Sequence, residues 1–421
     1  MKIQLPSTQC TLRFLFLFLI SQFAWGEGFR NSAPGAYGLG QSGGRYAYID
    51  DPSAALHNPA NLMDLDGESS LLFSPTIVHI ESEFQVDGGN LARSEEPIKL
   101  LPSFFAVSPI VSERFVFGLS VTVPYGLATE WENAGAFGPG GELRYLTPYK
   151  SEMLTMQLNP VMAFRVTDNL TMAVGLSAMY SKLRFEQFYP DNVYVTQETV
   201  AEAEVDGWGI GANFALSWDV TEKDRLALSI RSETTIDHQG HGKIGSLSGD
   251  GYTAGATDKS DASTRITYPW ILGIGYGRQL TEALTLELQY ERVGFSDFEE
   301  LNIDLANNTP LLGGANVTPQ DWDDSETFGI ALRYDHGEGL RSHASCQLFK
   351  SPVPDSTLST TIPDADQMAY TIGLTKQWDR AYWGFAYSYV EYDRREANVG
   401  GFSGEMQVKL HLLSLNMGWR F

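Results

Sequence analysis

Residues 207–219 read GWGIGANFALSWD, an alternation of apolar with small or polar side chains. A strand places successive side chains on opposite faces, so the apolar residues of this stretch would share one face. That face carries Trp208 at one end and Trp218 at the other. Aromatic side chains gather at the two interfaces of a membrane, so the stretch predicts one lipid-facing strand of a transmembrane β-barrel.

The same alternation recurs along the chain, at residues 268–276, 284–290, 327–334 and 382–389. The apolar faces repeatedly end in an aromatic residue, namely Tyr268, Tyr276, Tyr290, Tyr334, Trp378 and Trp419. In a soluble β-sandwich the apolar face would point into a core, and aromatic ends would not be needed so regularly. The pattern therefore favours an all-β fold, a transmembrane antiparallel β-barrel.

We count about 14 such segments, the even number expected of a bacterial barrel with both ends in the periplasm. They begin near Ser69, Ile98, Arg114, Glu152, Leu170, Ala203, Arg225, Ser263, Ala283, Trp322, Leu340, Gln367, Ala381 and Glu405. Short turns, as at residues 167–169 and 335–339, alternate with long polar stretches. We expect the long stretches, among them residues 240–262 and 299–321, to be extracellular loops.

The composition excludes several classes of function. The chain has 421 residues, with 29 Lys and Arg against 52 Asp and Glu, and a formal charge of −23. Nucleic acid is excluded as a partner, because its phosphates require clustered positive charge. The cysteines, Cys10 and Cys346, and the seven histidines form no pattern typical of a metal or catalytic site. We expect no metal, no cofactor and no enzymatic activity.

Residues 1–26 are typical of a secretory signal peptide. Lys2 and Arg13 supply positive charge, residues 14–20 read FLFLFLI, and Ala24 and Gly26 are the small residues that a signal peptidase requires. The apolar run is shorter than the roughly 20 residues of a membrane-spanning helix. We therefore expect cleavage after Gly26, which would make Glu27 the first residue of the exported protein.

Residues 27–66 do not alternate and are rich in Gly, Ala, Ser, Asn and Pro. A barrel with this number of strands encloses a lumen that leaks unless it is filled. We predict that residues 27–66 form a small N-terminal hatch, a plug inside the lumen, and that residues 67–421 form the barrel. The alternative for residues 27–66 is a flexible periplasmic leader.

A set of short motifs keeps its order along nearly the whole exported chain. They are GLGQSGGR (38–45), DDPSA (50–54), Asn58-Pro59-Ala60, VPYG (123–126), LNP (158–160), IPDAD (362–366) and the terminal Phe421. In these motifs the chain resembles the FadL/TodX family of outer-membrane transporters for long-chain fatty acids and other hydrophobic compounds. It departs from the family at Asn61, where Gly commonly follows the NPA motif.

The resemblance implies a 14-stranded barrel in the Gram-negative outer membrane, with a hatch inside it. A ligand would be captured on extracellular loops, would move to a pocket in the lumen, and would leave sideways through a kink in the third strand. The NPA motif, Asn58, Pro59 and Ala60, would belong to the part of the hatch that gates the channel.

Glycine and proline in the third strand are the candidates for the wall kink, because both weaken strand pairing. The residues are Gly118, Pro124 and Gly126. The alternative is that Pro124 simply ends its strand at a loop.

Two groups of residues are candidates for ligand contact. Trp131, Phe137, Leu143 and Tyr145 follow the third strand among glycines; they would form a capture groove if exposed, or else pack against neighbouring loops. A fatty-acid carboxylate needs a cation or N–H groups. The candidate cations are Arg144 in the same loop, and Arg231 and Arg333 on polar strand faces.

The expected function is uptake of long-chain fatty acids or similar hydrophobic molecules. The alternatives are a channel of the same family for aromatic hydrocarbons or alkanes, a general porin, and an outer-membrane lipase. Deleting residues 27–66 should open a plugged transporter and change a porin little. Expected partners are a hydrophobic small molecule, outer-membrane lipid and lipopolysaccharide, and the barrel-assembly machinery, which would read the terminal Phe421.

Overall fold

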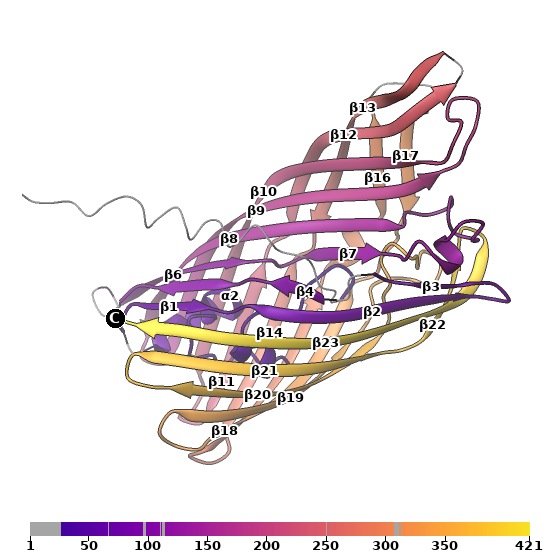
Figure 1. The fold of residues 1–421 in the computed structure, drawn as a ribbon. Helices are drawn as coiled ribbons and strands as arrows, with labels where there is room; N and C mark the ends of the chain where they lie inside the picture. Colours follow the sequence, from indigo (N-terminus) through magenta and orange to yellow (C-terminus); the bar gives the residue numbers. More distant parts are fainter. Residues whose placement is uncertain are drawn as a thin grey trace, which may run out of the picture.

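The strands of this chain close into one antiparallel barrel of 14 spans. Figure 1 shows how the sheet curves round on itself. The computed structural model describes residues 27–421 except 66, 96–97, 110, 112–113, 250, 307–310 and 313. The predicted signal peptide, residues 1–26, lies outside the described residues. The ring closes where the first span meets the last, with Ser70 opposite Arg420 and Thr76 opposite Ser414. A barrel joins its own edges in this way, as a sheet in lipid requires.

Several spans are interrupted and some short strands lie in loops, so the strand segments outnumber the spans. The segments are β1 (Ser70–Phe73), β2 (Thr76–Val86), β3 (Leu91–Arg93), β4 (Ile98–Leu101), β5 (Phe104–Val107), β6 (Phe115–Thr122), β7 (Gly126–Glu130), β8 (Lys150–Thr167), β9 (Leu170–Tyr189), β10 (Thr199–Asp219), β11 (Asp224–Arg231), β12 (Thr234–Gly249), β13 (Tyr252–Tyr268), β14 (Ile271–Gln279), β15 (Leu284–Val293), β16 (Glu300–Leu305), β17 (Gly314–Pro319), β18 (Ser325–Asp335), β19 (Leu340–Phe349), β20 (Gln367–Gln377), β21 (Ala381–Tyr392), β22 (Arg395–Val399) and β23 (Phe402–Arg420). Many predicted starts match, for example those at Ile98, Leu170 and Leu340.

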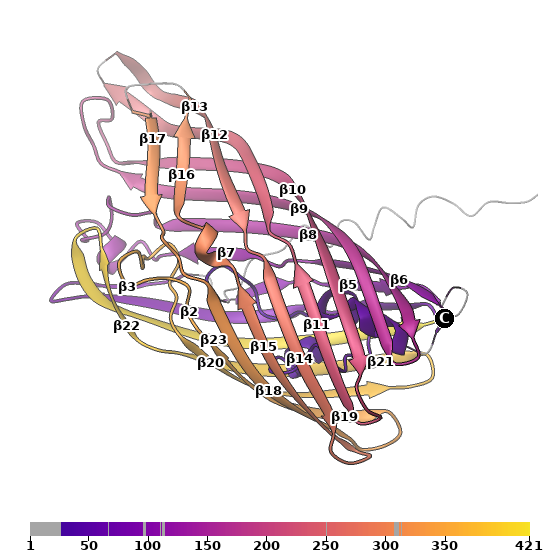
Figure 2. The same cartoon turned by 180° about the vertical axis from the view of Figure 1, so that it is seen from behind.

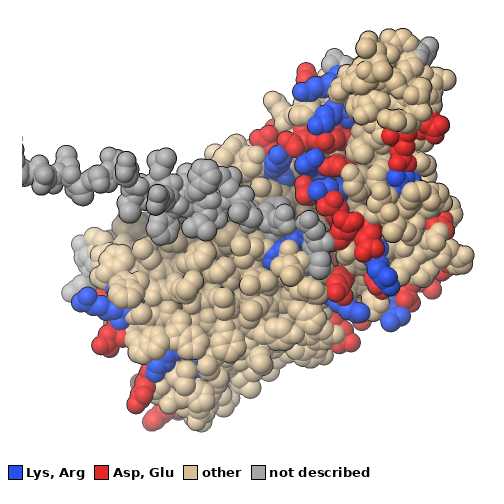
Figure 3. All heavy atoms as spheres, in the orientation of Figure 1, with Lys and Arg blue, Asp and Glu red and all other residues tan. Residues whose placement is uncertain are grey.

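The predicted alternation corresponds to an outer face and a lumenal face. On β10, Trp208 and Ile210 are 62% and 79% exposed, whereas Asn213 and Ser217 on the opposite face are buried. In Figure 3 the side chains of Lys, Arg, Asp and Glu gather toward the two ends of the barrel, and a broad band without them lies between. This uncharged band of exposed apolar side chains is the lipid-facing wall.

Tyr268 is an exception to the predicted aromatic interface. The structure buries its side chain completely inside the barrel. β13 ends at Tyr268 and β14 begins at Ile271, with Pro269 and Trp270 between them. Even-numbered residues are buried toward the end of β13 and partly or fully exposed in β14, so the interruption exchanges the two faces. The prediction for Tyr268 was wrong because a break at a proline shifts the alternation by one residue.

The predicted loops at residues 240–262 and 299–321 are also largely strands. β12 and β13 form one long hairpin, and β16 and β17 form a second hairpin that pairs with β13. Figures 1 and 2 show these segments extending beyond the other strands at one end of the barrel. The extension buries its own apolar cluster of Val195, Ile244, Leu247 and Leu312. Burial of these side chains stabilises strands where a polar composition suggested loops.

Residues 27–65, here called the N-terminal segment, are enclosed by the strands (Figure 1). The segment contains three short helices, α1 (Ala36–Gly40), α2 (Ala54–His57) and η2 (Pro59–Asp64). Every residue of α1 is buried. Another short helix, η3 (Gly135–Phe137), lies in the loop after β7, and η4 (Phe295–Asp297) follows β15. No helix within the described ranges has the length and apolar character needed to cross a bilayer.

The lumenal faces of β14 and β15 fit the N-terminal segment closely. A Cβ atom at Gly273 of β14 would lie 2.2 Å from the ring of Tyr46, and one at Gly277 would lie 2.3 Å from the ring of Tyr48. On β15, the Glu287 carboxylate accepts the backbone N–H of Tyr46 at 2.7 Å. The glycines of β14 therefore make room for the two tyrosines. Glu287 of β15 accepts hydrogen bonds from backbone N–H groups of the segment that are not paired in a sheet.

We predict that Gly273→Val destabilises the folded protein by about 1–3 kcal/mol, because the new side chain would overlap the Tyr46 ring. Urea unfolding in detergent, followed by tryptophan fluorescence, would measure the change. Gly245→Val is the control, since the nearest atom to a Cβ there is 4.0 Å away. An unfolding free energy of Gly273→Val equal to that of the control would contradict the close fit.

Candidate functional site

The third span of the barrel is broken in the middle of the wall. It consists of β6 and β7, and residues 123–125, with Pro124 at their centre, lie between the two strands. Both strands pair with β8 on one side. On the other side β6 pairs with β5, and among the described residues β4 pairs with β2. The described backbone contacts between the second span and β7 are confined to the far end of β7, where the Glu130 carbonyl accepts the N–H of Glu95 at 2.6 Å. Pro124 thus lies within the span, at a point where the second and third spans separate.

The two candidate glycines of this span have different surroundings. Gly126 is the first residue of β7 and lies at the break. Gly118 lies within β6, where a Cβ atom would approach Leu62 of η2 at 2.7 Å and Val161 of β8 at 2.9 Å. Gly118 therefore makes room for the N-terminal segment and is not part of the break.

The start of the N-terminal segment occupies the position that a neighbouring strand would fill. The backbone N–H of Asn31 donates to the Pro124 carbonyl at 3.0 Å, and that of Gly126 donates to the Phe29 carbonyl at 2.8 Å. The Asn31 side-chain Nδ2 donates to the Val123 carbonyl at 2.9 Å. Backbone groups exposed by the break are thereby satisfied from inside the barrel.

Phe29 is held in a box of aromatic rings. The ring centroids of its partners lie 5.3–5.9 Å away, and the partners are Tyr125, Tyr268, Phe295, Phe298 and Trp322. They come from four separate places in the chain, since only Phe295 and Phe298 are near neighbours, so no local pattern signals the box. Edge-to-face packing of this kind adds to the apolar burial.

The NPA motif anchors the other end of the segment to β10. Asn58 Nδ2 donates to the Tyr46 carbonyl at 2.7 Å and to Ser217 Oγ at 2.9 Å, while Asn58 Oδ1 accepts the backbone N–H of Ala60 at 3.1 Å. Pro59 begins η2, where its missing N–H costs nothing. Ala60 is fully buried.

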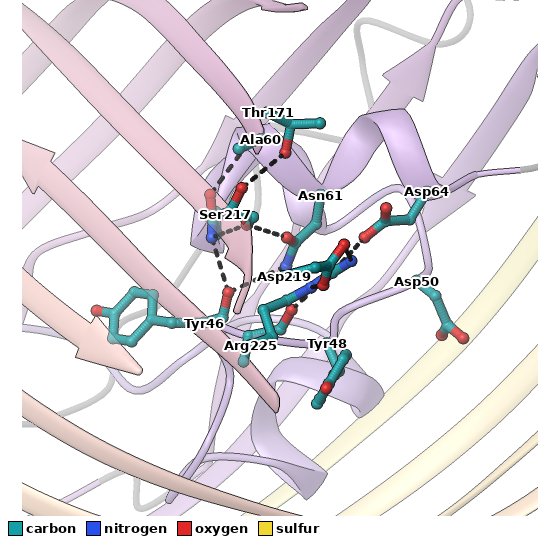
Figure 4. Close-up of polar contacts among 12 residues, drawn as sticks. Tyr46, Tyr48, Asp50, Ala60, Asn61, Asp64, Thr171, Ser217, Asp219 and Arg225 are labelled. Carbon is teal, nitrogen blue, oxygen red and sulfur yellow. Dashed lines mark hydrogen bonds and ion pairs between the residues drawn. The ribbon is translucent and has the colours of Figure 1, made fainter. Parts of the chain in front are cut away.

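Asn61, where the chain departs from the family motif, reinforces this anchor. Its Nδ2 donates to the Tyr46 carbonyl at 3.0 Å, and its Oδ1 accepts a hydrogen bond from Ser217. Figure 4 shows the three residues together, next to Arg225 between Asp64 and Asp219. The asparagine thus contributes two hydrogen bonds that a glycine side chain could not make.

Buried ion pairs join the segment to β15. Glu291 of β15 accepts from Arg30 at 2.5 Å and from Arg45 at 2.8 Å, and it also accepts the Tyr46 hydroxyl. Glu287 lies on the polar face of the predicted strand 284–290, and Glu291 follows directly after it on the same face. These acids are the signal for this contact in the sequence, because a buried acid must find a partner. We had not identified them as site residues from the sequence.

Two of the three candidate cations are fully engaged. Arg144 pairs with Glu198 at 2.5 Å and donates to the carbonyl of Phe137. Arg333 faces the lumen as predicted, and there it donates to the Tyr37 hydroxyl and to the Tyr48 carbonyl. Both arginines hold protein groups in place, which leaves neither free for a ligand carboxylate.

Arg231 is different. Its guanidinium donates to the Leu56 carbonyl, and no described Asp or Glu forms an ion pair with it. It lines a cavity of about 90 Å³ next to the wall break, together with Thr122, Val123, Pro124 and Tyr125. Across residues 30–33 lies a smaller, more apolar cavity of about 40 Å³. The N-terminal segment therefore separates two lumenal spaces, and the cation lies on the side of the break.

The apolar residues of the loop after β7 pack inward. Trp131, Phe137 and Leu143 are at most 1% exposed, and only Tyr145, at 40%, reaches the surface. Trp131 stacks on Phe137 and donates its Nε1–H to the Thr360 carbonyl at 3.0 Å. Of the two alternatives, packing against neighbouring loops is therefore the one found for these three residues, because the loop needs a core of its own.

A larger cavity of about 480 Å³ lies among the extracellular segments, a volume that suits a drug-sized ligand. Its apolar lining includes Leu146, Phe185, Leu301, Ile303 and Leu305. Leu146 adjoins the predicted group but was not in it. In the described part of the chain, no cluster of three or more His, Cys, Asp or Glu side chains is placed to hold a metal.

Comparison with known proteins finds a family and a fold. The model of the family described as outer membrane protein transport protein (OMPP1/FadL/TodX) matches residues 17–421. Long-chain fatty acid transport proteins of Salmonella typhi and Escherichia coli K12 are 26% and 24% identical to the chain, and 96% of both chains is covered in each case. Outer membrane protein P1 of Haemophilus influenzae is 24% identical, with 80% of both chains covered.

Solved structures share the architecture. A FadL homologue of Pseudomonas aeruginosa superposes with a TM-score of 0.80 at 19% identity, covering 94% of this chain and 100% of the other. The toluene transporter TodX of Pseudomonas putida gives 0.75 at 18% identity, covering 93% and 99%. At these identities the likeness establishes the fold.

We predict that Asn31→Ala loosens the start of the N-terminal segment, because it removes the hydrogen bond to Val123. A loss of about 1 kcal/mol would raise the population of the open state roughly fivefold, which single-channel recording in a planar bilayer would show as more frequent openings. Ser32→Ala is the control, since Ser32 Oγ is buried without a hydrogen-bond partner. Equal opening frequencies in both variants would contradict this role of Asn31.

Proposed function

The chain belongs to the FadL/TodX family of outer-membrane transport proteins, and we propose that the molecules it takes up are long-chain fatty acids. As a member of this family it is a channel of the Gram-negative outer membrane for hydrophobic molecules. Relatives described as long-chain fatty acid transport proteins and as toluene transporters leave the ligand open. The ligand must therefore be inferred from this chain's own residues.

Arg231 is the observation that carries the proposal. A cation with no ion pair, facing a cavity, is stabilised by an incoming carboxylate through a charge-assisted hydrogen bond. Arg30 and Arg45 line the same cavity, but they share Glu291. An alkane or a monoaromatic hydrocarbon would leave the Arg231 charge uncompensated, so the cavity favours an apolar chain that ends in an anion.

The path follows from the order of the cavities. A fatty acid enters the extracellular cavity of about 480 Å³, whose lining of Leu, Ile and Phe suits an alkyl chain. It then reaches the lumenal cavities on either side of residues 30–33. The hatch role of residues 27–66 is to keep these spaces separate until a ligand is bound, with the NPA anchor holding its far end on β10.

The exit is the break in the third span. Residues 29–31 cover it from inside, and their displacement would extend the Arg231 cavity toward the wall at residues 123–125. The ligand would then leave sideways into lipid, in which its chain is soluble. A general porin needs no such cover, and a lipase needs a nucleophile and base that no predicted motif supplies, so we propose transport without catalysis.

Two further partners belong to the proposal. The exposed apolar wall would contact outer-membrane lipid and lipopolysaccharide. The barrel-assembly machinery would read Phe421, whose side chain is 63% exposed at the end of β23.

The decisive test is binding of a radiolabelled long-chain fatty acid to the purified protein in detergent, competed with toluene and with an alkane. We expect saturable binding that the hydrocarbons do not displace. In Arg231→Gln, affinity for the acid should fall roughly 10- to 100-fold, the value of one hydrogen bond to a charged group, while affinity for the methyl ester stays constant.

Two control variants isolate the charge. Arg231→Lys should keep part of the affinity, because it keeps the cation. Arg265→Gln should keep all of it, since Arg265 is exposed on the outer face and already pairs with Asp237. Equal losses for acid and ester in Arg231→Gln would rule out carboxylate recognition, and displacement by toluene or the alkane alone would favour the hydrocarbon alternative.

A further inference from the structure

Asp364 is a buried carboxylate without a basic partner. It lies in the loop between β19 and β20 and is 1% exposed. Its Oδ2 accepts Ser351 Oγ at 2.8 Å and the backbone N–H of Gly28 at 3.3 Å, and its Oδ1 accepts Gln367 Nε2 at 3.0 Å. Among the described ion pairs none involves Asp364, and Arg395 beside it pairs with Asp355 instead. Burying an ionised carboxylate costs free energy unless a positive charge lies close to it.

The backbone at Glu27 and Gly28 is fixed next to this carboxylate. Gly28 has a φ of +58°, and a Cβ atom there would lie 2.6 Å from the Trp322 ring and 3.3 Å from Pro352. The Arg30 backbone N–H closes a turn onto the Glu27 carbonyl at 2.9 Å. The nitrogen of Glu27 is one residue from that of Gly28, hence within about 3.6 Å of it.

The ion pairs around this point leave one acid without a partner. Three buried acids lie here, and the described ion pairs join Glu27 and Glu291 to Arg30 and Arg45 but give Asp364 no partner. Burial accordingly raises the pKa of Asp364 to about 7 and that of Glu27 to about 8, the latter against the opposing effect of Arg30. One further positive charge close to Asp364 would give this third carboxylate the partner that the other two already have.

We propose that the amino terminus of the exported protein supplies this charge, so that the α-ammonium of Glu27 pairs with the Asp364 carboxylate and fixes the start of the N-terminal segment. Hydrolysis of the peptide bond after Gly26 leaves a carboxylate on Gly26 and an ammonium group on Glu27. An ammonium has three donors, which suit the acids gathered here. The inference rests on the expected cleavage site and is independent of the ligand.

Removal of the leader would then complete the lumenal structure as well as release the protein for export. An uncleaved chain has an uncharged peptide nitrogen at Glu27 and leaves Asp364 without a cation. Asp364 is by this account a positioning residue, which acts on residues 29–31 at the wall break through the chain terminus.

The test measures the reactivity of one amine. Protein purified from outer membranes is first checked by mass spectrometry for Glu27 as its first residue. One sample is kept folded in detergent and another is unfolded in urea, and both are acetylated with an N-hydroxysuccinimide ester. The acetylated and free forms of the N-terminal peptide are then quantified. We expect the folded α-amine to react at least roughly tenfold more slowly than the unfolded one, and Asp364→Asn to remove most of this protection.

Asp355→Asn is the matched control, since it makes the same change in the same loop at an 86% exposed side chain, and protection should persist. If Asp364→Asn does not fold, the pH dependence of labelling in the unaltered protein decides. Pairing raises the pKa of the α-amine above its ordinary value of about 7.7–8.0. The proposal is overturned by an ordinary or lower value, by a first residue other than Glu27, or by equal labelling of the folded and unfolded wild type.

Discussion

Backbone hydrogen bonding in a medium without water is the constraint on which this structure depends. Lipid offers no partner to an N–H or C=O group, so the wall must satisfy its own. β23 meets β1 and β2 to close the ring, and most spans pair along both sides. In the third span the pairing lapses, and there residues 29–31 supply the missing groups from inside. Residues 29–31 therefore lie in the lumen and also complete the hydrogen bonding of the barrel wall, so their position decides whether the wall is continuous.

The lumen follows a second rule, that a buried charge needs a partner. Glu287 and Glu291 of β15 bind backbone N–H groups and arginines of the N-terminal segment, which holds the middle of the segment against that wall. At its far end the asparagines of η2 and its cap hold it on β10. Against this background of paired groups, Arg231 stands out because it lacks an acid. A buried cation that faces the wall break and has no acid among the described ion pairs is suited to an anionic apolar ligand.

Local sequence patterns were sufficient to predict the strands of the barrel wall. They were insufficient to predict the contacts inside the lumen. The period of two residues is a local property, so residues 207–219 and 327–334 identified strands with their lipid-facing sides, and the count of about 14 spans followed. Tyr268 was assigned to the wrong side because one proline shifts the period. The aromatic box could not be predicted, since its members come from distant parts of the chain. The acids of β15 signal that they need partners, but the sequence does not show which residues these are. Nor could spacing show that Glu198 of another loop pairs with Arg144, whereas Arg231 has no acid among the described ion pairs.

The match between glycines of β14 and tyrosines of the N-terminal segment has an evolutionary consequence. Tyr46 and Tyr48 occupy volume that Gly273 and Gly277 leave empty, so a substitution on either side requires a compensating one on the other. We therefore expect the two parts to change together, although they lie more than two hundred residues apart in the chain. A segment taken from a distant relative would bring side chains shaped for another lumen. The N-terminal segment is therefore matched to the lumenal face of its own barrel and is not an exchangeable module.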